Sequence, residues 1–174
     1  MRIVAGRWRG RKIEAPTGDL VRPTGDRVRE SWMSIVHNIL PDARVLDLCA
    51  GSGALGLEAL SRGAAACDFV ENAPHSQAVM QANLAHLGGH EGAVLHRADA
   101  VAFVQQLAPL AYDVAFADPP YATDIAMRLV ERWIDVPFAA VFGIEHPASL
   151  SLPAPGLTRR YGATALTFFR ASDP

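Results

Sequence analysis

The sequence has few cysteines and no long hydrophobic run. Cys49 and Cys67 are the only cysteines among 174 residues, and they form no CxxC pair. A secreted domain stabilised by disulfides needs more of them. Charged residues or prolines interrupt every apolar stretch before it approaches the roughly 18 residues of a membrane-spanning helix. The sequence therefore excludes a disulfide-stabilised scaffold and predicts no membrane span.

A leader signal is missing as well. The start, MRIVAGRWRGRK, is basic but lacks the apolar centre and the cleavage site of a secretory signal peptide. Half of the residues are hydrophobic, which is enough for the core of one domain. We expect a cytoplasmic protein, and a monomer, because nothing exposed and apolar in the sequence indicates an obligate partner.

Positive charge is not in excess, but it is unevenly placed. The formal net charge is −2, which argues against a general binder of polyanions. However, eight of the 16 Lys and Arg residues fall within the first 29 positions: Arg2, Arg7, Arg9, Arg11, Lys12, Arg22, Arg27 and Arg29. Arginine pairs with phosphates and stacks on bases. We expect residues 1–23 to form a basic, polyanion-binding hairpin arm and residues 24–174 the main domain; a merely solvated charged face is the alternative.

From residue 44 onward, short apolar segments alternate with helical patterns. This alternation predicts a mostly parallel sheet with helices on both faces. The expected strands are 45–49, 67–71, 93–96, 112–117 and 138–145, with two more flanking Gly162, and the expected helices are 53–62, 74–87, 101–107 and 125–134. Upstream, residues 2–5 and 11–14 predict a short hairpin with Trp8 near its tip, 16–23 a linker, and a helix begins near Thr24 or Asp26 and ends before Pro41.

In such a sheet, ligands bind at the carboxyl ends of the strands. The first core strand leads into V45-L-D-L-C-A-G-S-G-A-L-G56. Its three glycines let the backbone approach a ligand, and the next helix offers free N–H groups there. Ser52 lies between two of the glycines, where a hydroxyl that bonds the backbone is expected. Glu71, twenty residues after Gly51, ends the next strand and suits a ribose diol.

Asp47 separates two cofactor classes. It lies four residues before Gly51, where a carboxylate would repel the pyrophosphate of a nicotinamide dinucleotide. It suits instead the cationic amino group of a methionine moiety. The loop therefore predicts S-adenosylmethionine; a loop that serves only tight packing is the alternative.

The fourth strand ends in D118-P-P-Y121. Consecutive prolines fix the backbone and remove N–H donors. The Asp118 carboxylate and a proline carbonyl then provide two acceptors for the two N–H groups of an exocyclic amine, and Tyr121 offers an aromatic face to an unpaired base. An ordinary proline turn is the alternative. No metal site is expected, because Gly88 and Gly89 break the helix between His86 and His90, and His146 is interpreted as a structural histidine.

These motifs together resemble the RsmD family of small-subunit (16S) ribosomal RNA guanine-N2 methyltransferases. The resemblance covers nearly the whole chain and rests on R2-I-V-A-G-R-W-R-G-R-K12, R22-P-T-G-D-R-V-R-E30, D47-L-C-A-G-S-G-A-L-G-L-E-A-L-S-R-G63, F69-V-E71 and D118-P-P-Y121. It implies a Rossmann-like class I methyltransferase fold with a seven-stranded sheet, S-adenosylmethionine as methyl donor, and one guanine of ribosomal RNA or of the small ribosomal subunit as target. Cys49 and Gly25 depart from the family's pattern without touching the chemistry.

The resemblance also implies residue roles. Asp47 and the turn Gly51, Ser52 and Gly53 would hold the methionine part of the cofactor, Glu71 the ribose, and Asn72, Asp99 and Ala100 the adenine. Asp118, Pro119, Pro120 and Tyr121 would hold the amine for direct in-line methyl transfer. Arg7, Trp8, Arg9, Arg11 and Lys12 would contact the RNA, although Trp8 could equally pack against the sheet.

Two other functions stay open. A DNA adenine-N6 methyltransferase also acts on an exocyclic amine, but it usually needs a separate target-recognition region, for which 174 residues leave no room. A catalytically inactive RNA-binding module would have no use for converging acceptors. A nicotinamide oxidoreductase is a more distant third.

Overall fold

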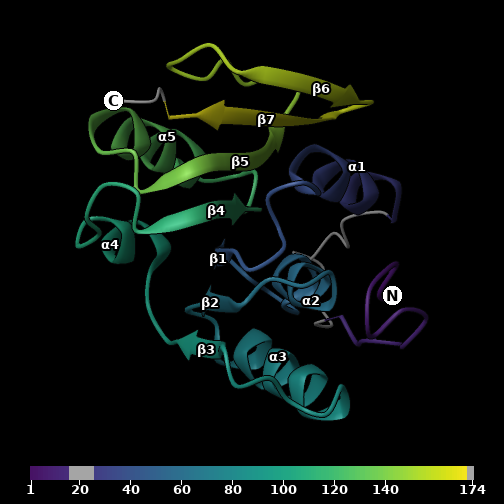
Figure 1. Cartoon of the computed structure of the whole chain (residues 1–174). Coiled ribbons are helices and arrows are strands. Elements are labelled where there is room, and N and C mark those ends of the chain that lie inside the picture. Colours follow the sequence, from purple (N-terminus) through teal and green to yellow (C-terminus); the bar gives the residue numbers. More distant parts are fainter. Residues whose placement is uncertain (16–25, 172–174) are drawn as a thin grey trace.

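A seven-stranded sheet runs through the molecule (Figure 1). The computed structural model describes residues 1–15 and 26–171. The strands are β1 (Arg44–Leu48), β2 (Ala66–Val70), β3 (Ala93–His96), β4 (Tyr112–Ala117), β5 (Ala139–Pro147), β6 (Leu157–Tyr161) and β7 (Thr164–Arg170). The helices are α1 (Asp26–Val36), α2 (Ala54–Ser61), α3 (Pro74–His86), α4 (Ala100–Val104) and α5 (Ile125–Asp135).

The strand order is β3-β2-β1-β4-β5-β7-β6. Strands β1 to β5 are parallel to their neighbours, whereas β7 pairs antiparallel with both β5 and β6. The predicted fold, a mostly parallel sheet of class I methyltransferase type, is confirmed. The order reverses between β1 and β4, which is the point where ligands bind in sheets of this kind.

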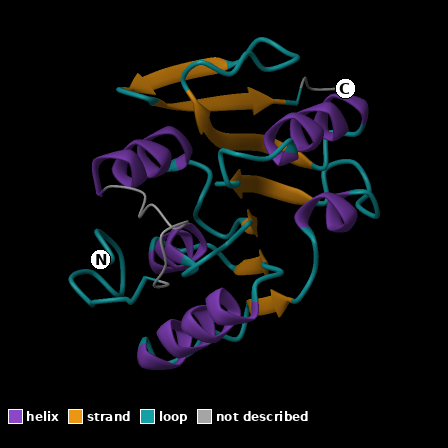
Figure 2. Cartoon of the chain, turned by 180° about the vertical axis from the view of Figure 1, so that it is seen from behind, coloured by secondary structure: helices purple, strands orange, loops and turns teal. Residues whose placement is uncertain are grey.

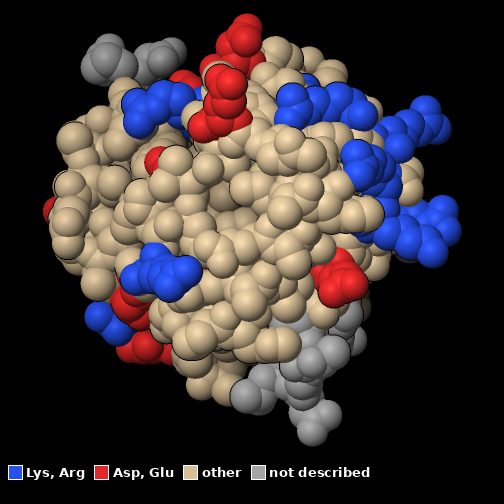
Figure 3. Space-filling view, turned by 90° about the horizontal axis from the view of Figure 1, so that it is seen from below, with Lys and Arg blue, Asp and Glu red and all other residues tan. Residues whose placement is uncertain are grey.

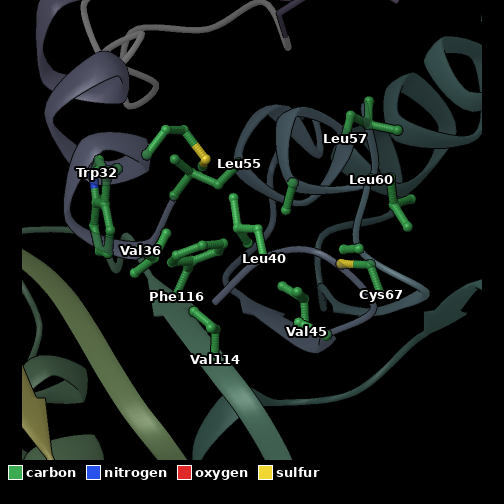
Figure 4. Packing of buried hydrophobic residues seen from close by; sticks show 14 of the residues in the cluster. Trp32, Val36, Leu40, Val45, Leu55, Leu57, Leu60, Cys67, Val114 and Phe116 are labelled. Carbon is green, nitrogen blue, oxygen red and sulfur yellow. The ribbon is translucent and has the colours of Figure 1, made fainter. Parts of the chain in front are cut away.

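Helices cover both faces of the sheet (Figure 2). On one face, residues of α1, α2 and α3 pack with Val45, Phe69 and Phe116 into one hydrophobic cluster, part of which Figure 4 shows. On the other face, α4 and α5 pack with Leu46, Ala115 and Phe142 into a second cluster. Because successive residues of β4 from Val114 to Ala117 alternate between these clusters, this part of the strand is apolar on both faces.

Helix α1 shows how the sequence specifies this packing. Trp32 and Val36 are fully buried, and Val28, Ile35 and Ile39 pack against the same cluster, which gives the helix one apolar face. Trp32 meets Phe116 and Phe168 edge to face, at 5.4 and 5.2 Å between ring centroids. The helix ends at Val36 rather than just before Pro41, and Ile39 lies in the following turn. The predicted linker at 16–23 and the helix start at Thr24 lie outside the described residues.

The N-terminal segment turns back on itself as predicted, with a single antiparallel bridge between Arg2 and Lys12. The tip, however, faces inward. Trp8 is only 5% exposed and belongs to the hydrophobic cluster of α1, α2 and α3, together with Ile3 and Ile13. Of the two roles that the sequence leaves open for Trp8, the structure shows packing, because its indole is buried in the core.

Helix α2 holds this segment in place. The Glu58 carboxylate, 1% exposed, accepts the backbone N–H groups of Val4 and Ala5 at 2.7 and 3.0 Å. Ser61 donates its hydroxyl to the Ala5 carbonyl and accepts the Trp8 N–H through the same oxygen. Gly6 passes so close that a Cβ there would lie 1.8 Å from the Ser61 carbonyl oxygen. Only glycine fits this contact.

Candidate active site

The glycine turn between β1 and α2 uses backbone conformations that favour glycine. Gly51 and Gly53 have φ angles of +55° and +77°. A Cβ at Gly53 would also lie 2.7 Å from the Met80 side chain. The turn thereby brings the backbone from the end of β1 into the start of α2, at the reversal of strand order.

Asp47 lies beneath this turn. It is 1% exposed, and its carboxylate accepts the backbone N–H of Gly56 at 2.9 Å. Burial, together with the nearby carboxylates of Asp118 and Glu71, raises the pKa of Asp47 to about 8, although the Gly56 hydrogen bond lowers it. A cation that binds next to Asp47 would favour its ionised form.

Glu71 ties the second strand to the turn. One of its carboxylate oxygens accepts the N–H of Gly51 at 2.9 Å, and the other accepts that of Ala73 at 2.8 Å. The side chain thus lies at the predicted place, and it supports the glycine turn directly. Its contact with a ribose stays a prediction.

The residues predicted around the adenine lie at the next strand ends. Asn72 is exposed, and Ala100 is buried at the start of α4. The Asp99 carboxylate caps α4 by accepting the N–H of Ala102 at 2.8 Å. Asp99 therefore has a local structural role, and its contact with a cofactor stays a prediction.

The strand register brings the predicted acidic residues together. Leu48 is level with Val70 of β2 and with Ala117 of β4, so Cys49 follows between Glu71 and Asp118. Burial first, and then the carboxylates of Glu71, Asp118, Asp47 and Asp99, raise the pKa of the Cys49 thiol. Four carboxyl groups thus surround one point at the carboxyl edge of the sheet, and they favour a cationic ligand there.

The D118-P-P-Y121 motif follows β4 at this edge. The N–H of Asp118 donates to the Leu48 carbonyl of β1, and Pro119 is buried. The Pro120 carbonyl accepts both the N–H and the hydroxyl of Thr123. The Pro120 carbonyl is therefore already in use within the turn, and the role of the Pro119 carbonyl as an acceptor for an amine stays a prediction.

Tyr121 is 38% exposed, but its hydroxyl is held from behind. It donates to the Glu145 carboxylate at 2.9 Å and lies 2.7 Å from the Thr164 hydroxyl. Sequence reasoning missed both partners. The only signal was the position of Glu145 at the end of a strand that neighbours β4.

This arrangement matches known proteins. A family model described as Conserved hypothetical protein 95 matches residues 1–169. The chain belongs to this family, the RsmD family. Over 121 residues it is 40% identical to the Ribosomal RNA small subunit methyltransferase D of Escherichia coli, and over 181 residues 31% identical to the YlbH protein of Bacillus subtilis. The match to the Escherichia coli protein covers 70% of this chain and 60% of the relative, and the match to YlbH covers 98% of both.

Solved structures agree with this assignment to the RsmD family. The yhhF methyltransferase structure from Escherichia coli superposes with a TM-score of 0.82 at 33% identity, covering 98% of this chain and 97% of the other. A hypothetical protein from Thermus thermophilus gives 0.84 at 31% identity, covering 98% and 99%. The predicted resemblance is confirmed over the whole described fold.

Ser52 of this RsmD-family chain departs from its predicted contact. Its hydroxyl donates to the Met1 sulfur at 3.9 Å, and its side chain is buried. The expectation that the hydroxyl bonds the backbone is wrong. Asn83 instead fixes the turn, because its amide donates to the carbonyls of both Ser52 and Glu14.

The basic side chains crowd one side of the molecule (Figure 3), the side on which the N-terminal segment lies in Figure 1. Arg7, Arg9, Arg11 and Lys12 are all exposed. Two of them also contact the end of α3: the guanidinium of Arg7 donates to the Gly89 carbonyl at 3.4 Å, and that of Arg11 to the His86 carbonyl. Arg7 also lies over the Trp8 ring, 4.2 Å from its centroid. The basic stretch is therefore partly structural.

His146 makes structural contacts in the C-terminal part of the sheet. His146 is buried and lines a cavity of about 350 Å³ between β6, β7 and the loop before β6. Its ring nitrogens bond the Pro147 carbonyl and the Thr167 hydroxyl, and burial lowers its pKa. Within residues 1–15 and 26–171 no three His, Cys, Asp or Glu side chains are grouped so as to hold a metal ion. In the same part of the chain no helix is long and apolar enough to cross a membrane.

Proposed function

We propose that this protein transfers the methyl group of S-adenosylmethionine to the exocyclic N2 amine of a guanine in small-subunit ribosomal RNA. The observation that carries the proposal is the meeting of Asp47, Glu71 and Asp118 around the glycine turn, beside Tyr121. The chain spans about 60% of the length of the first curated relatives, which are named ribosomal RNA small subunit methyltransferase D.

The residues present fit the cofactor. S-adenosylmethionine, when bound, supplies a methyl group on a positively charged sulfur. A buried Asp47, with Glu71 and Asp118 nearby, favours a ligand that carries positive charge and disfavours the pyrophosphate of a nicotinamide dinucleotide. Solved neighbours of the same fold include a methyltransferase structure complexed with S-adenosylhomocysteine, at 15% identity.

The acceptors after β4 fit an amine. The Asp118 carboxylate and the Pro119 carbonyl can accept two N–H groups, orient the nitrogen lone pair and hold the amine in place. Holding reacting groups in line contributes most of the rate enhancement in such transfers. Asp118 or water can take the proton that leaves the nitrogen once it is methylated.

The substrate assignment rests on the basic side of the molecule and on the family. Exposed Arg9 and Lys12 suit phosphates. An inactive RNA-binding module is disfavoured, because converging acceptors serve no purpose in mere binding. We propose that the enzyme works in the cytoplasm as a monomer on ribosomal RNA or on the assembling small subunit.

One experiment separates the candidates. The full chain is incubated with tritiated S-adenosylmethionine and with small-subunit particles, naked small-subunit RNA or DNA. Tritium in a guanine of the RNA, located by nuclease digestion and chromatography, is the expected result. Label in DNA adenine would favour the DNA methyltransferase, and binding of the RNA without label would favour the inactive module.

A further inference from the structure

The hydrogen-bond network behind Tyr121 has a defined direction. A tyrosine hydroxyl has one proton to donate. Since the Glu145 carboxylate can only accept, this proton goes to Glu145, at 2.9 Å. The Thr164 hydroxyl, at 2.7 Å, must then donate to the Tyr121 oxygen.

The pKa of Tyr121 is consistent with this direction. Burial and the Glu145 carboxylate raise the pKa of Tyr121 and the Thr164 hydrogen bond lowers it, so that the pKa lies at about 12. A donor to the phenol oxygen favours the ionised form, and an acceptor from it favours the neutral form. Tyr121 is therefore a neutral side chain with both hydrogen-bonding functions of its hydroxyl in use.

The two partners come from different strands of a rigid scaffold. Glu145, 7% exposed, lies near the end of β5, and Thr164 begins β7, which pairs with β5 in a continuous antiparallel register. One hydrogen bond would let the tyrosine ring pivot about its oxygen. Two bonds from different directions, together with the two prolines before Tyr121, restrict the ring plane.

We propose that Glu145 and Thr164 are positioning residues for methyl transfer, which fix the exposed Tyr121 ring at the angle where a target base stacks beside Asp118. The inference rests on the proposed function. A base stacked on a fixed ring presents its amine to the acceptors at Asp118 and Pro119 in one orientation. A ring free to pivot would still bind the base but would present the amine less often in line.

The test compares Thr164→Val, which keeps the shape and loses the donor, with the matched control Thr164→Ser, which keeps the hydroxyl. We expect Thr164→Val to lower kcat on RNA by about tenfold, because the lost hydrogen bond no longer helps to hold the Tyr121 ring at the angle that methyl transfer requires. Thr164→Ser should stay within about twofold of wild type. Binding of S-adenosylhomocysteine, measured by calorimetry, should not change in either.

The same substitutions in a Tyr121→Phe background show whether Thr164 and Glu145 act through the hydroxyl. There Thr164→Val should have less than about a twofold further effect, because the contact is already lost. Glu145→Gln, which keeps an acceptor oxygen, should be mild in the wild-type background and silent in Tyr121→Phe. Tyr121→Phe alone removes both hydrogen bonds and should lower kcat by about tenfold or more, and this result decides the point even if Thr164→Val unfolds.

Two results would overturn the inference. Equal losses from Thr164→Val with and without the Tyr121 hydroxyl would mean that Thr164 acts on its own. A wild-type kcat in both Thr164→Val and Tyr121→Phe would mean that the ring needs no positioning. Failure of the proposed function looks different, since the wild-type protein would then label no nucleic acid at all.

Discussion

Asp47→Asn should stabilise the protein while weakening its cofactor binding. Asp47 is 1% exposed and accepts the Gly56 N–H at 2.9 Å, and an asparagine oxygen can accept the same bond. Because the pKa of Asp47 is raised from 3.8 to about 8, the folded protein holds a proton that the unfolded chain releases. The stability that the folded protein gains from this bound proton is fully present below about pH 4 and is lost as the pH rises toward 8.

The magnitude follows from these two pKa values. At pH 7 the lost contribution is at most about 4 kcal/mol, since each pH unit between the two pKa values contributes about 1.4 kcal/mol. Asparagine avoids this loss, but its amide N–H₂ must be accommodated, so we expect a gain of about 1–3 kcal/mol in the free energy of unfolding. Below pH 4 the gain should disappear.

Urea denaturation of wild type and variant at pH 4, 6 and 8 measures this difference. Asp113→Asn is the matched control, because Asp113 accepts the Arg44 N–H from an exposed position. In parallel, the affinity of wild type for S-adenosylhomocysteine should rise from pH 6 to pH 8, as Asp47 ionises against the cationic amino group of the ligand, and that of Asp47→Asn should not. A stability difference that is the same at all three pH values would refute the protonated Asp47.

The other predictions concern single groups of the site. Asp118→Ala should lower kcat by about 10²–10³, by analogy with removal of a group aimed at the reacting centre, with little change in S-adenosylhomocysteine affinity by calorimetry. Glu71→Ala should weaken that affinity by about 1–3 kcal/mol, because the Gly51 turn loses its acceptor and the ribose its partner; an unchanged affinity would remove Glu71 from the cofactor site. Arg9→Ala with Lys12→Ala should reduce the log–log salt slope of RNA binding by about 1–2, measured by filter binding, whereas identical slopes would make these side chains a solvated face.

Much of this site could be predicted from the sequence, because parallel strands place their ends at one edge. Asp47, Glu71 and Asp118 are each recognised by their position relative to an apolar strand, and the register brings all three together. Neither the position of each residue at its strand nor the meeting of parallel strand ends at one edge depends on knowing which side chains are in contact. Most strand boundaries follow from local patterns of apolar residues as well, whereas α1 and α4 end earlier than these patterns predict.

The features that the sequence did not predict depend on contacts between segments far apart in the chain. The sequence leaves Trp8 open between stacking on a base and packing, and only the docking of its segment on Ser61 and Glu58 buries it. Glu145 and Thr164 carry no motif, and their partner Tyr121 lies more than twenty residues away from each of them. Sequence patterns give the face and the edge of each element, but they do not give side-chain partners across the sheet.

The docking of the N-terminal segment on α2 has a consequence for how a substrate is chosen. Since Gly6 lies directly against the Ser61 carbonyl and Glu58 holds Val4 and Ala5, the backbone that carries Arg9 and Lys12 is docked on α2. Under the proposed function, the phosphate contacts of these two side chains would then lie at a fixed separation from Tyr121. The enzyme would select a polynucleotide by its folded shape, which must present a phosphate to Arg9 or Lys12 and an unstacked guanine to Tyr121 together.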